Sequence, residues 1–140
     1  MTLATMESCT GGFLANSITE VPDSAAYFRG GVVAYTNSVK IENGVPEAII
    51  EKHGGESQQT ATAMARAIRE KMGADFGIGI AGMAGPSEFE GKQVGLAYLS
   101  VAGPGEVREL ELRLPPRRVV IKRRSSNQAL IELRKLLATG

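Results

Sequence analysis

Two periodicities of apolar residues divide the chain into nine segments. Four short apolar runs predict strands, at 2–7, 30–36, 76–82 and 94–102. A fifth strand is predicted after the Gly-Pro-Gly turn signal at 103–105, where Leu110, Leu112 and Leu114 alternate with charged residues. That alternation predicts half-burial, whereas the glycine-rich third run predicts a central strand buried on both faces, with backbone packed closely around it.

Helical spacing marks the other four segments. The first helix is predicted at 13–19, and the second runs from Pro46 to His53, before two glycines. The third follows Ser57, a candidate N-cap, and its buried stripe consists of Ala61, Met64, Ala65 and Ile68. The fourth lies beyond Pro115 and Pro116, and its apolar stripe consists of Ala129, Leu130, Leu133, Leu136 and Leu137. Residues 37–40 are predicted only to lead out of the second strand.

The order of these segments indicates the fold class. Strand, helix, strand, helix, helix, strand, strand, strand and helix combine helical crossovers with a hairpin. We therefore expect an α/β protein with a mixed sheet covered by helices. A length of 140 residues suits one compact domain, so residues 1–140 are predicted to form a single unit.

Composition and charge exclude several functions. Hydrophobic residues make up 43% of the chain and charged residues 22%, as in ordinary globular proteins. Sixteen basic and fifteen acidic residues leave a net charge of +1, so neither nucleic acid nor a membrane is an expected partner. No apolar run approaches the roughly 20 residues of a membrane-spanning helix and no leader pattern is present, so we expect a cytoplasmic location.

A single cysteine and a single histidine limit the available chemistry. Neither an intrachain disulfide nor a common zinc site can be assembled from them, so no metal is expected. Cys9 is a candidate nucleophile, but no histidine near it would activate the thiol, and a small buried residue is the better interpretation. His53 lies at the end of a predicted helix, where an imidazole commonly satisfies terminal carbonyl groups.

Candidate nucleophilic chemistry involves Ser8, at the point where the first strand runs into the first helix. A serine hydroxyl needs a base, and a desolvated lysine can supply one. Lys40 follows the second strand, and Tyr35 near the end of that strand could hydrogen-bond to either partner. The structural alternatives are that Ser8 caps the helix and that Lys40 is a solvated surface lysine. The residues alone favour these alternatives.

Glycines are concentrated in two loops that could face one crevice. Gly11 and Gly12 precede the first helix, whose N-terminus would offer free amide donors to an anion or an oxyanion. Six more glycines lie between Gly77 and Gly95, around a loop at 83–93 that is expected to be exposed. The alternative is that these glycines only form turns and permit tight packing.

Five cations lie between Arg117 and Arg124, at the start of the last helix, where the helix dipole disfavours them. This basic run is either a solvated helix face or a contact for a substrate phosphate. It lacks interleaved aromatic residues, so a nucleic-acid interface is not expected.

Four stretches occur in a specific order and spacing: Glu7–Gly12 (ESCTGG), Gly30–Lys40 (GGVVAYTNSVK), the helix with Met64 and Ala65, and Ala81–Pro86 (AGMAGP). Together they resemble the CinA C-terminal domain family, whose members include nicotinamide mononucleotide deamidases. The similarity extends over almost the whole chain.

The resemblance implies a three-layer α/β domain that hydrolyses the carboxamide of nicotinamide mononucleotide to nicotinate mononucleotide and ammonia, without a metal or other cofactor. It implies Ser8 as the nucleophile, Lys40 as its base, and Tyr35 as a residue that assists by hydrogen bonding. A lysine base predicts a rate that rises on the alkaline side. The implied substrate-binding residues are Thr10, Gly11, Gly12, Asn37, Gly82, Ala84, Gly85, Arg117 and Arg118.

Departures from the family pattern keep a second hypothesis open. The chain starts almost at the first strand, without the helix that usually precedes it. A usual Gly-Ser-Ser is Asp23–Ala25 here, Ala81 stands where Thr is common, and Ser87–Gln93 replaces a glycine pair and its proline. The alternative is therefore an altered or inactive nucleotide-binding or regulatory module. Apolar surface left by the missing helix predicts a homodimer or higher homo-oligomer.

Overall fold

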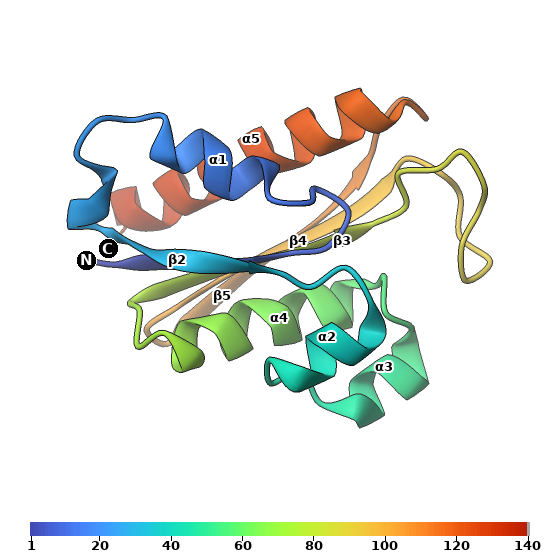
Figure 1. The fold of residues 1–140 in the computed structure, drawn as a ribbon, viewed down its shortest axis with the longest axis horizontal. Coiled ribbons are helices and arrows are strands. Elements are labelled where there is room, and N and C mark those ends of the chain that lie inside the picture. Colours follow the sequence, from blue (N-terminus) through green and yellow to red (C-terminus); the bar gives the residue numbers. More distant parts are fainter. Residues whose placement is uncertain (140) are drawn as a thin grey trace.

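The computed structural model describes residues 1–139 and contains one five-stranded sheet with helices on both faces (Figure 1). The strands are β1 (Leu3–Glu7), β2 (Phe28–Val33), β3 (Phe76–Gly82), β4 (Leu96–Gly103) and β5 (Glu106–Arg113). The helices are α1 (Phe13–Thr19), α2 (Asn37–Glu42), α3 (Glu47–His53), α4 (Gln58–Lys71) and α5 (Arg118–Thr139), with a short 3-10 helix η1 (Ser24–Ala26). The predicted α/β fold, a single domain with a mixed sheet flanked by helices, is confirmed.

The strand order β2-β1-β3-β4-β5 determines where a site can form. β1 pairs in parallel with both β2 and β3, whereas β4 runs antiparallel to β3 and to β5. The carboxyl ends of the three parallel strands therefore lie at one edge of the sheet. The chain leaves this edge at Ser8, at Ala34 and at Met83, and such an edge is where ligands bind in open α/β sheets.

Two helical layers enclose the sheet, with α1 and α5 on one face and α2, α3 and α4 on the other (Figure 1). Each face has its own apolar core. Ile78, Ile80 and Leu99 belong to the core under α1 and α5, whereas Met6 and Met64 belong to the core on the side of α4. Within residues 1–139, no helix combines the length and the apolar character that crossing a bilayer requires.

The glycines of β3 let α4 pack directly on the sheet backbone. A Cβ at Gly77 would overlap the carbonyl oxygen of Ala65, and one at Gly79 would overlap that of Ala61. All seven residues of β3 are buried. The prediction of a central strand with close backbone packing is therefore confirmed.

Two predictions near the second strand are wrong. β2 spans Phe28–Val33 instead of 30–36, so Tyr35 lies beyond the strand. Residues 37–40 do not merely lead away from it, because Asn37–Glu42 forms α2, with the Thr36 hydroxyl accepting a hydrogen bond from the amide of Val39. A helix of six residues is too short to show a period in the sequence, although its threonine cap was visible.

The buried stripe of α5 also differs from the predicted one. It contains Ile121, Ser125, Ala129, Glu132 and Leu136. Leu130 and Leu133 are only partly buried, and Leu137 is exposed. The short side chains of Ser125 and Ala129 allow close packing, which turns the leucines toward a shallow apolar hollow of about 270 Å³ that Met1 and Val21 also line. The homo-oligomer expected from the sequence stays a prediction.

Glu7, the last residue of β1, accepts hydrogen bonds from amides at the N-terminus of α1. Its buried carboxylate accepts hydrogen bonds from the amides of Leu14 (2.9 Å) and Ala15 (3.0 Å) and from the hydroxyl of Thr10 (2.6 Å). A carboxylate at a helix N-terminus is favourable, because it compensates the partial positive charge of the unpaired amides. The expectation that these amides are free for a ligand is therefore wrong for Leu14 and Ala15.

We expect Gly79→Ala to lower the free energy of unfolding by about 1–3 kcal/mol or more, because the new methyl group would force α4 away from β3. The measurement is equilibrium denaturation. Gly105→Asn is the control, because the β4–β5 turn offers open space and asparagine tolerates the left-handed backbone there. A Gly79 variant as stable as the control would contradict the packing described for α4.

We expect Glu7→Gln to lower the free energy of unfolding by at least about 2 kcal/mol, because the amide side chain keeps one acceptor oxygen where the carboxylate uses two. Chemical denaturation followed by circular dichroism measures this loss. The matched variant Glu109→Gln changes an exposed carboxylate on β5 and should stay within about 0.5 kcal/mol of the wild type. Equal stability of the two variants would show that the Glu7 contacts contribute little.

Candidate functional site

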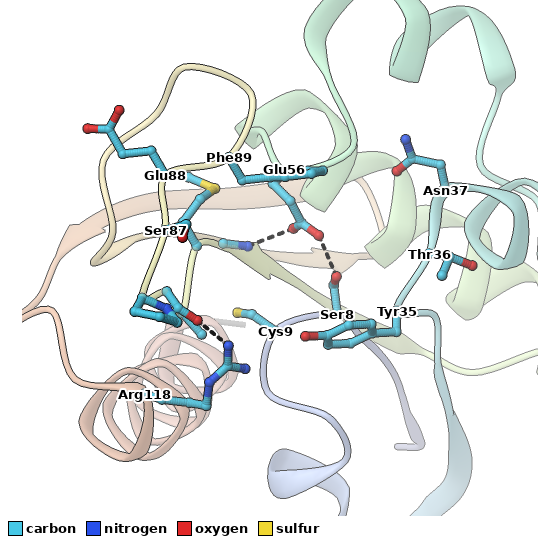
Figure 2. A pocket seen from close by; sticks show the side chains of 15 residues that line it. Ser8, Cys9, Tyr35, Thr36, Asn37, Glu56, Ser87, Glu88, Phe89 and Arg118 are labelled. Carbon is cyan, nitrogen blue, oxygen red and sulfur yellow. Dashed lines mark hydrogen bonds between the residues drawn. The ribbon is translucent and has the colours of Figure 1, made fainter.

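A cavity of about 490 Å³ lies at the sheet edge where β1, β2 and β3 end. Its size is within the usual range for small-molecule sites. Three parts of the chain form most of its wall, as Figure 2 shows: the turn after β1, the segment between β2 and α2, and the loop after β3. The lining residues used below are Ser8, Cys9, Tyr35, Asn37, Glu56, Gly82, Ala84, Gly85 and Arg118.

Ser8 lies directly after β1, where its amide donates to the carbonyl of Ile80 (2.9 Å) and extends the parallel pairing by one residue. Its side chain is almost fully buried, and its hydroxyl donates a hydrogen bond of 2.6 Å to Oε1 of Glu56 (Figure 2). The alternative that Ser8 caps the helix is wrong, because Gly12 occupies the N-cap position of α1. The hydroxyl is instead directed at a buried carboxylate.

Glu56, which the sequence analysis missed, lies at the centre of the site. It occupies the turn between α3 and α4, and its carboxylate contacts three other parts of the chain. Oε1 accepts from Ser8 and from Lys40 Nζ (3.1 Å), and Oε2 accepts from the amide of Gly82 (2.8 Å). Burial raises the pKa of Glu56 above the ordinary carboxyl value, although the Lys40 charge and these hydrogen bonds oppose the rise.

Lys40 projects from α2 into the interior, and only 1% of its surface is exposed. Its ammonium group donates to Glu56 Oε1 and to the backbone carbonyl of Tyr35 (3.5 Å). The alternative of a solvated surface lysine is therefore wrong. In the part of the chain that the structure describes, Lys40 makes no hydrogen bond to Ser8, so Glu56 stands between the two predicted partners.

Tyr35, between β2 and α2, and Asn37, the first residue of α2, line the cavity. The Tyr35 ring lies in front of Ser8 in Figure 2 and is 57% exposed. Its phenol group has no hydrogen-bond partner among residues 1–139, so the contact that was expected with Ser8 or Lys40 is absent here. Both side chains are placed to contact a ligand instead.

Cys9 also reaches the cavity wall, but its thiol is not a nucleophile. Burial, followed by the negative charge of Glu56, raises the pKa of Cys9 to about 12. The reactive thiolate is therefore essentially absent near neutral pH. The interpretation of Cys9 as a small buried residue holds.

Thr10, Gly11 and Gly12 do not line the cavity. The Thr10 hydroxyl donates to Glu7, and the Gly11 amide donates to the carbonyl of Ser8 (3.0 Å). These three residues shape the turn that holds Ser8. Of the described residues that follow Ser8 in this turn, Cys9 lines the cavity, so its amide is the candidate donor to an oxyanion.

The loop after β3 is only partly exposed. Met83 and Ala84 are buried, and Ala84 and Gly85 line the cavity with Gly82, as expected for the facing loop. Farther along, the Glu90 carboxylate accepts from the amides of Gly55 (2.8 Å) and Glu56 (3.0 Å). The expectation of an exposed loop is thus wrong for its first two residues.

Lys92 joins the end of this loop to the turn before α4. Its ammonium group donates to the carbonyl of Glu56 and lies 3.5 Å from that of His53. The terminal carbonyl of α3 is therefore satisfied by Lys92, where the sequence suggested the His53 imidazole. The backbone of Glu56 is held by side chains on both its amide and its carbonyl group.

The structure separates the two arginines that the sequence analysis paired. Arg118, the first residue of α5, lines the cavity and donates to the carbonyl of Gly85 (Figure 2). Arg117 is exposed and does not line the cavity. Arg118 is therefore the cation of the basic run that is placed for an anionic ligand group.

This arrangement can polarise the Ser8 hydroxyl at the cavity wall. Ser8 supplies the oxygen, Glu56 supplies an acceptor for its proton, and Lys40 balances the buried negative charge. Within residues 1–139, no group of three or more His, Cys, Asp or Glu side chains could hold a metal ion.

Comparisons with known sequences identify relatives over the full length of the chain. The family model of the CinA C-terminal domain matches residues 1–137. A CinA-like protein of Gemmatimonas aurantiaca is 43% identical over 140 residues, which cover 99% of this chain and 33% of the relative. A CinA-like protein of Gloeobacter violaceus is also 43% identical, over 96% of this chain and 32% of its own length. The chain thus spans about a third of the curated relatives that it matches.

Solved structures agree with the sequence relatives. A CinA superfamily protein from Klebsiella pneumoniae superposes with a TM-score of 0.95 at 28% identity, covering 99% of this chain and 88% of that one. The competence/damage inducible protein CihA of Agrobacterium tumefaciens gives a TM-score of 0.92 at 33% identity, with coverages of 97% and 85%. With the family model matching all but the last few residues, the chain belongs to the CinA C-terminal domain family.

Proposed function

We propose that this domain is an amidohydrolase that converts nicotinamide mononucleotide to nicotinate mononucleotide and ammonia. The observation that carries the proposal is the 2.6 Å hydrogen bond from Ser8 to a buried carboxylate at the wall of a cavity of small-molecule size. A serine hydroxyl that donates to a buried base is poised as a nucleophile. The choice of deamidation as the reaction rests on the resemblance to the family.

Hydrolysis of a carboxamide at Ser8 would proceed in two halves. Ser8 Oγ attacks the amide carbon, the carbonyl electron pair moves onto oxygen, and the C–N bond then breaks with a proton delivered to nitrogen, so that ammonia leaves. Water next attacks the serine ester, the acyl C–Oγ bond breaks, and the acid is released. The amide of Cys9, at the cavity wall, is the candidate donor to the developing oxyanion.

The other end of the cavity suits an anionic group. Arg118 lies at the cavity wall opposite the segment that carries Tyr35 and Asn37 (Figure 2). A guanidinium group binds phosphate oxygens with charge-assisted hydrogen bonds. We infer that Arg118 contacts the phosphate, while Tyr35 and Asn37 contact the ribose or the ring.

A second candidate function is a binding or regulatory module that retains the cavity without turnover. The observation that favours it is the ion pair of Lys40 with Glu56, because an ammonium group held by a carboxylate is not available as the base of Ser8. Saturable binding of nicotinamide mononucleotide in calorimetry, with no release of ammonia, would support this candidate over the enzyme.

We expect purified protein to release ammonia from nicotinamide mononucleotide, and Ser8→Ala to reduce the rate at least about 10³-fold, as for other nucleophiles that act as part of a unit. Coupled detection of ammonia and chromatography of the product acid measure both. Ser17→Ala is the matched control, because its hydroxyl donates to the Phe13 carbonyl on α1 and does not line the cavity. Retention of most activity in the Ser8 variant would remove Ser8 as the nucleophile.

We expect Arg118→Ala to raise KM by about one to two decades and to change kcat less, because a phosphate contact is made in the ground and transition states alike. The riboside, which lacks the phosphate, should be nearly insensitive to the substitution. Arg123→Ala is the control, because Arg123 is exposed and outside the cavity wall. Equal losses for nucleotide and riboside would contradict the phosphate contact.

A further inference from the structure

We propose that Glu56, and not Lys40, accepts the proton of Ser8, and that Lys40 is the hydrogen-bond donor that holds the Glu56 carboxylate in place. This inference rests on the proposed hydrolytic function and identifies its general base. It also gives the buried ion pair of Lys40 with Glu56 a role in catalysis, because Lys40 then positions the base.

The contacts of Ser8 support a carboxylate base. Its hydroxyl donates directly to Glu56 Oε1 at 2.6 Å, which is within the range of a short hydrogen bond to a charged acceptor. A general base must lie within hydrogen-bond reach of the proton that it takes. Among the described residues, only Glu56 meets this condition for Ser8.

The contacts of Lys40 are those of a proton donor. Its Nζ donates to Glu56 Oε1 and lies 3.5 Å from the carbonyl oxygen of Tyr35, and both partners are acceptors. A lysine base would need a lone pair directed at Ser8 Oγ. Instead, both contacts of Nζ are made to oxygen acceptors, and neither is made to Ser8 Oγ.

The position of Glu56 is fixed from several sides, as expected for a base. Oε2 accepts from the Gly82 amide, the Glu56 amide donates to Glu90, and the Glu56 carbonyl accepts from Lys92. These contacts come from β3 and from the loop that follows it. They leave Oε1 directed at Ser8, with Lys40 beside it.

Each proton transferred in the two half-reactions comes from Ser8 or from water, so no further reactant is needed. The Oγ–H bond of Ser8 breaks and an Oε1–H bond forms on Glu56 as Oγ bonds to the amide carbon. Glu56 passes this proton to the leaving nitrogen, takes a second proton from the attacking water, and returns it to Oγ when the ester is cleaved. Lys40 gains and loses no proton in this sequence.

A carboxylate base predicts a specific pH dependence. Glu56 acts as a base only when it is ionised, and burial raises its pKa, so the rate should rise with pH through a limb above the ordinary carboxyl range and then level off. The charged or titratable groups that face Glu56 or hold its backbone are Cys9, Lys40, Glu90 and Lys92, with Tyr35, Glu88 and Arg118 on the same cavity wall.

The experiment measures the reactivity of Ser8 separately from any substrate. A fluorophosphonate probe labels activated serines, and mass spectrometry gives the labelling rate at Ser8 across the pH range. Deamidation of nicotinamide mononucleotide is followed in parallel. The variants are Glu56→Gln, Lys40→Met and the double variant that removes both charges, with Glu132→Gln as a control, since Glu132 is a buried, ion-paired carboxylate on α5 outside the cavity.

We expect Glu56→Gln to reduce the labelling of Ser8 by about 10²–10⁴-fold and to abolish the pH limb. Lys40→Met should shift the limb to higher pH and retain labelling above it, because the Lys40 charge lowers the pKa of Glu56. The double variant, which leaves no unpaired buried charge, should label as slowly as Glu56→Gln. Glu132→Gln should label like the wild type, and thermal unfolding verifies the fold of each variant.

A lysine base gives the opposite pattern. Lys40→Met would then lose labelling at every pH, and Glu56→Gln would keep at least a third of it, and either result overturns the proposal. Labelling that depends on Glu56 in a protein that does not deamidate the nucleotide would support the base and contradict the proposed substrate. Deamidation that survives Glu56→Gln would support the substrate and contradict the base.

Discussion

The buried carboxylate of Glu56 is the constraint on which the rest of this site depends. An ionised side chain in the interior is costly unless other groups compensate its charge and fill its acceptor positions. Here Lys40 supplies the charge, and Ser8 and the amide of Gly82 supply donors. Each of these groups comes from a different part of the sheet edge, so the carboxylate joins the ends of β1 and β3 to α2. Removing Glu56 takes the carboxylate partner from both Ser8 and Lys40, and removing Lys40 leaves the Glu56 charge uncompensated, which is why pairs of variants are needed to separate their roles.

The topology of the sheet makes this convergence possible. Because β1 lies between β2 and β3 and is parallel to both, three chain segments leave the same edge together. Glu7, the last residue of β1, then fixes the turn that carries Ser8 by accepting from Thr10 and from two amides of α1. Two successive residues thus direct the Glu7 carboxylate toward α1 and the Ser8 hydroxyl toward Glu56.

The sequence predicted the helices and strands that show a clear hydrophobic period. It did not predict the side-chain contacts between distant segments, because these leave no periodic pattern. The glycine-rich strand β3 and the alternating strand β5 were predictable, because burial on both faces or on one face leaves a pattern. α2 has only six residues and shows no period, so the burial of Lys40 could not be predicted. Glu56 precedes a serine N-cap in a turn, where a glutamate is ordinarily solvated, and only the fold brings it to Ser8. The family resemblance selected Ser8 and Lys40 but not the carboxylate between them.

The loop after β3 belongs to the same hydrogen-bonded system as Glu56. Glu90 accepts from the amides of Gly55 and Glu56, and Lys92 donates to the Glu56 carbonyl while its ammonium lies 5.6 Å from the centre of the Tyr98 ring. Gly54 makes the approach possible, because a Cβ there would overlap the Glu90 carboxylate. A change in this loop can therefore act on Ser8 through the backbone of Glu56. The loop and Glu56 are for this reason one structural unit, and a different loop would require a different way of holding the carboxylate.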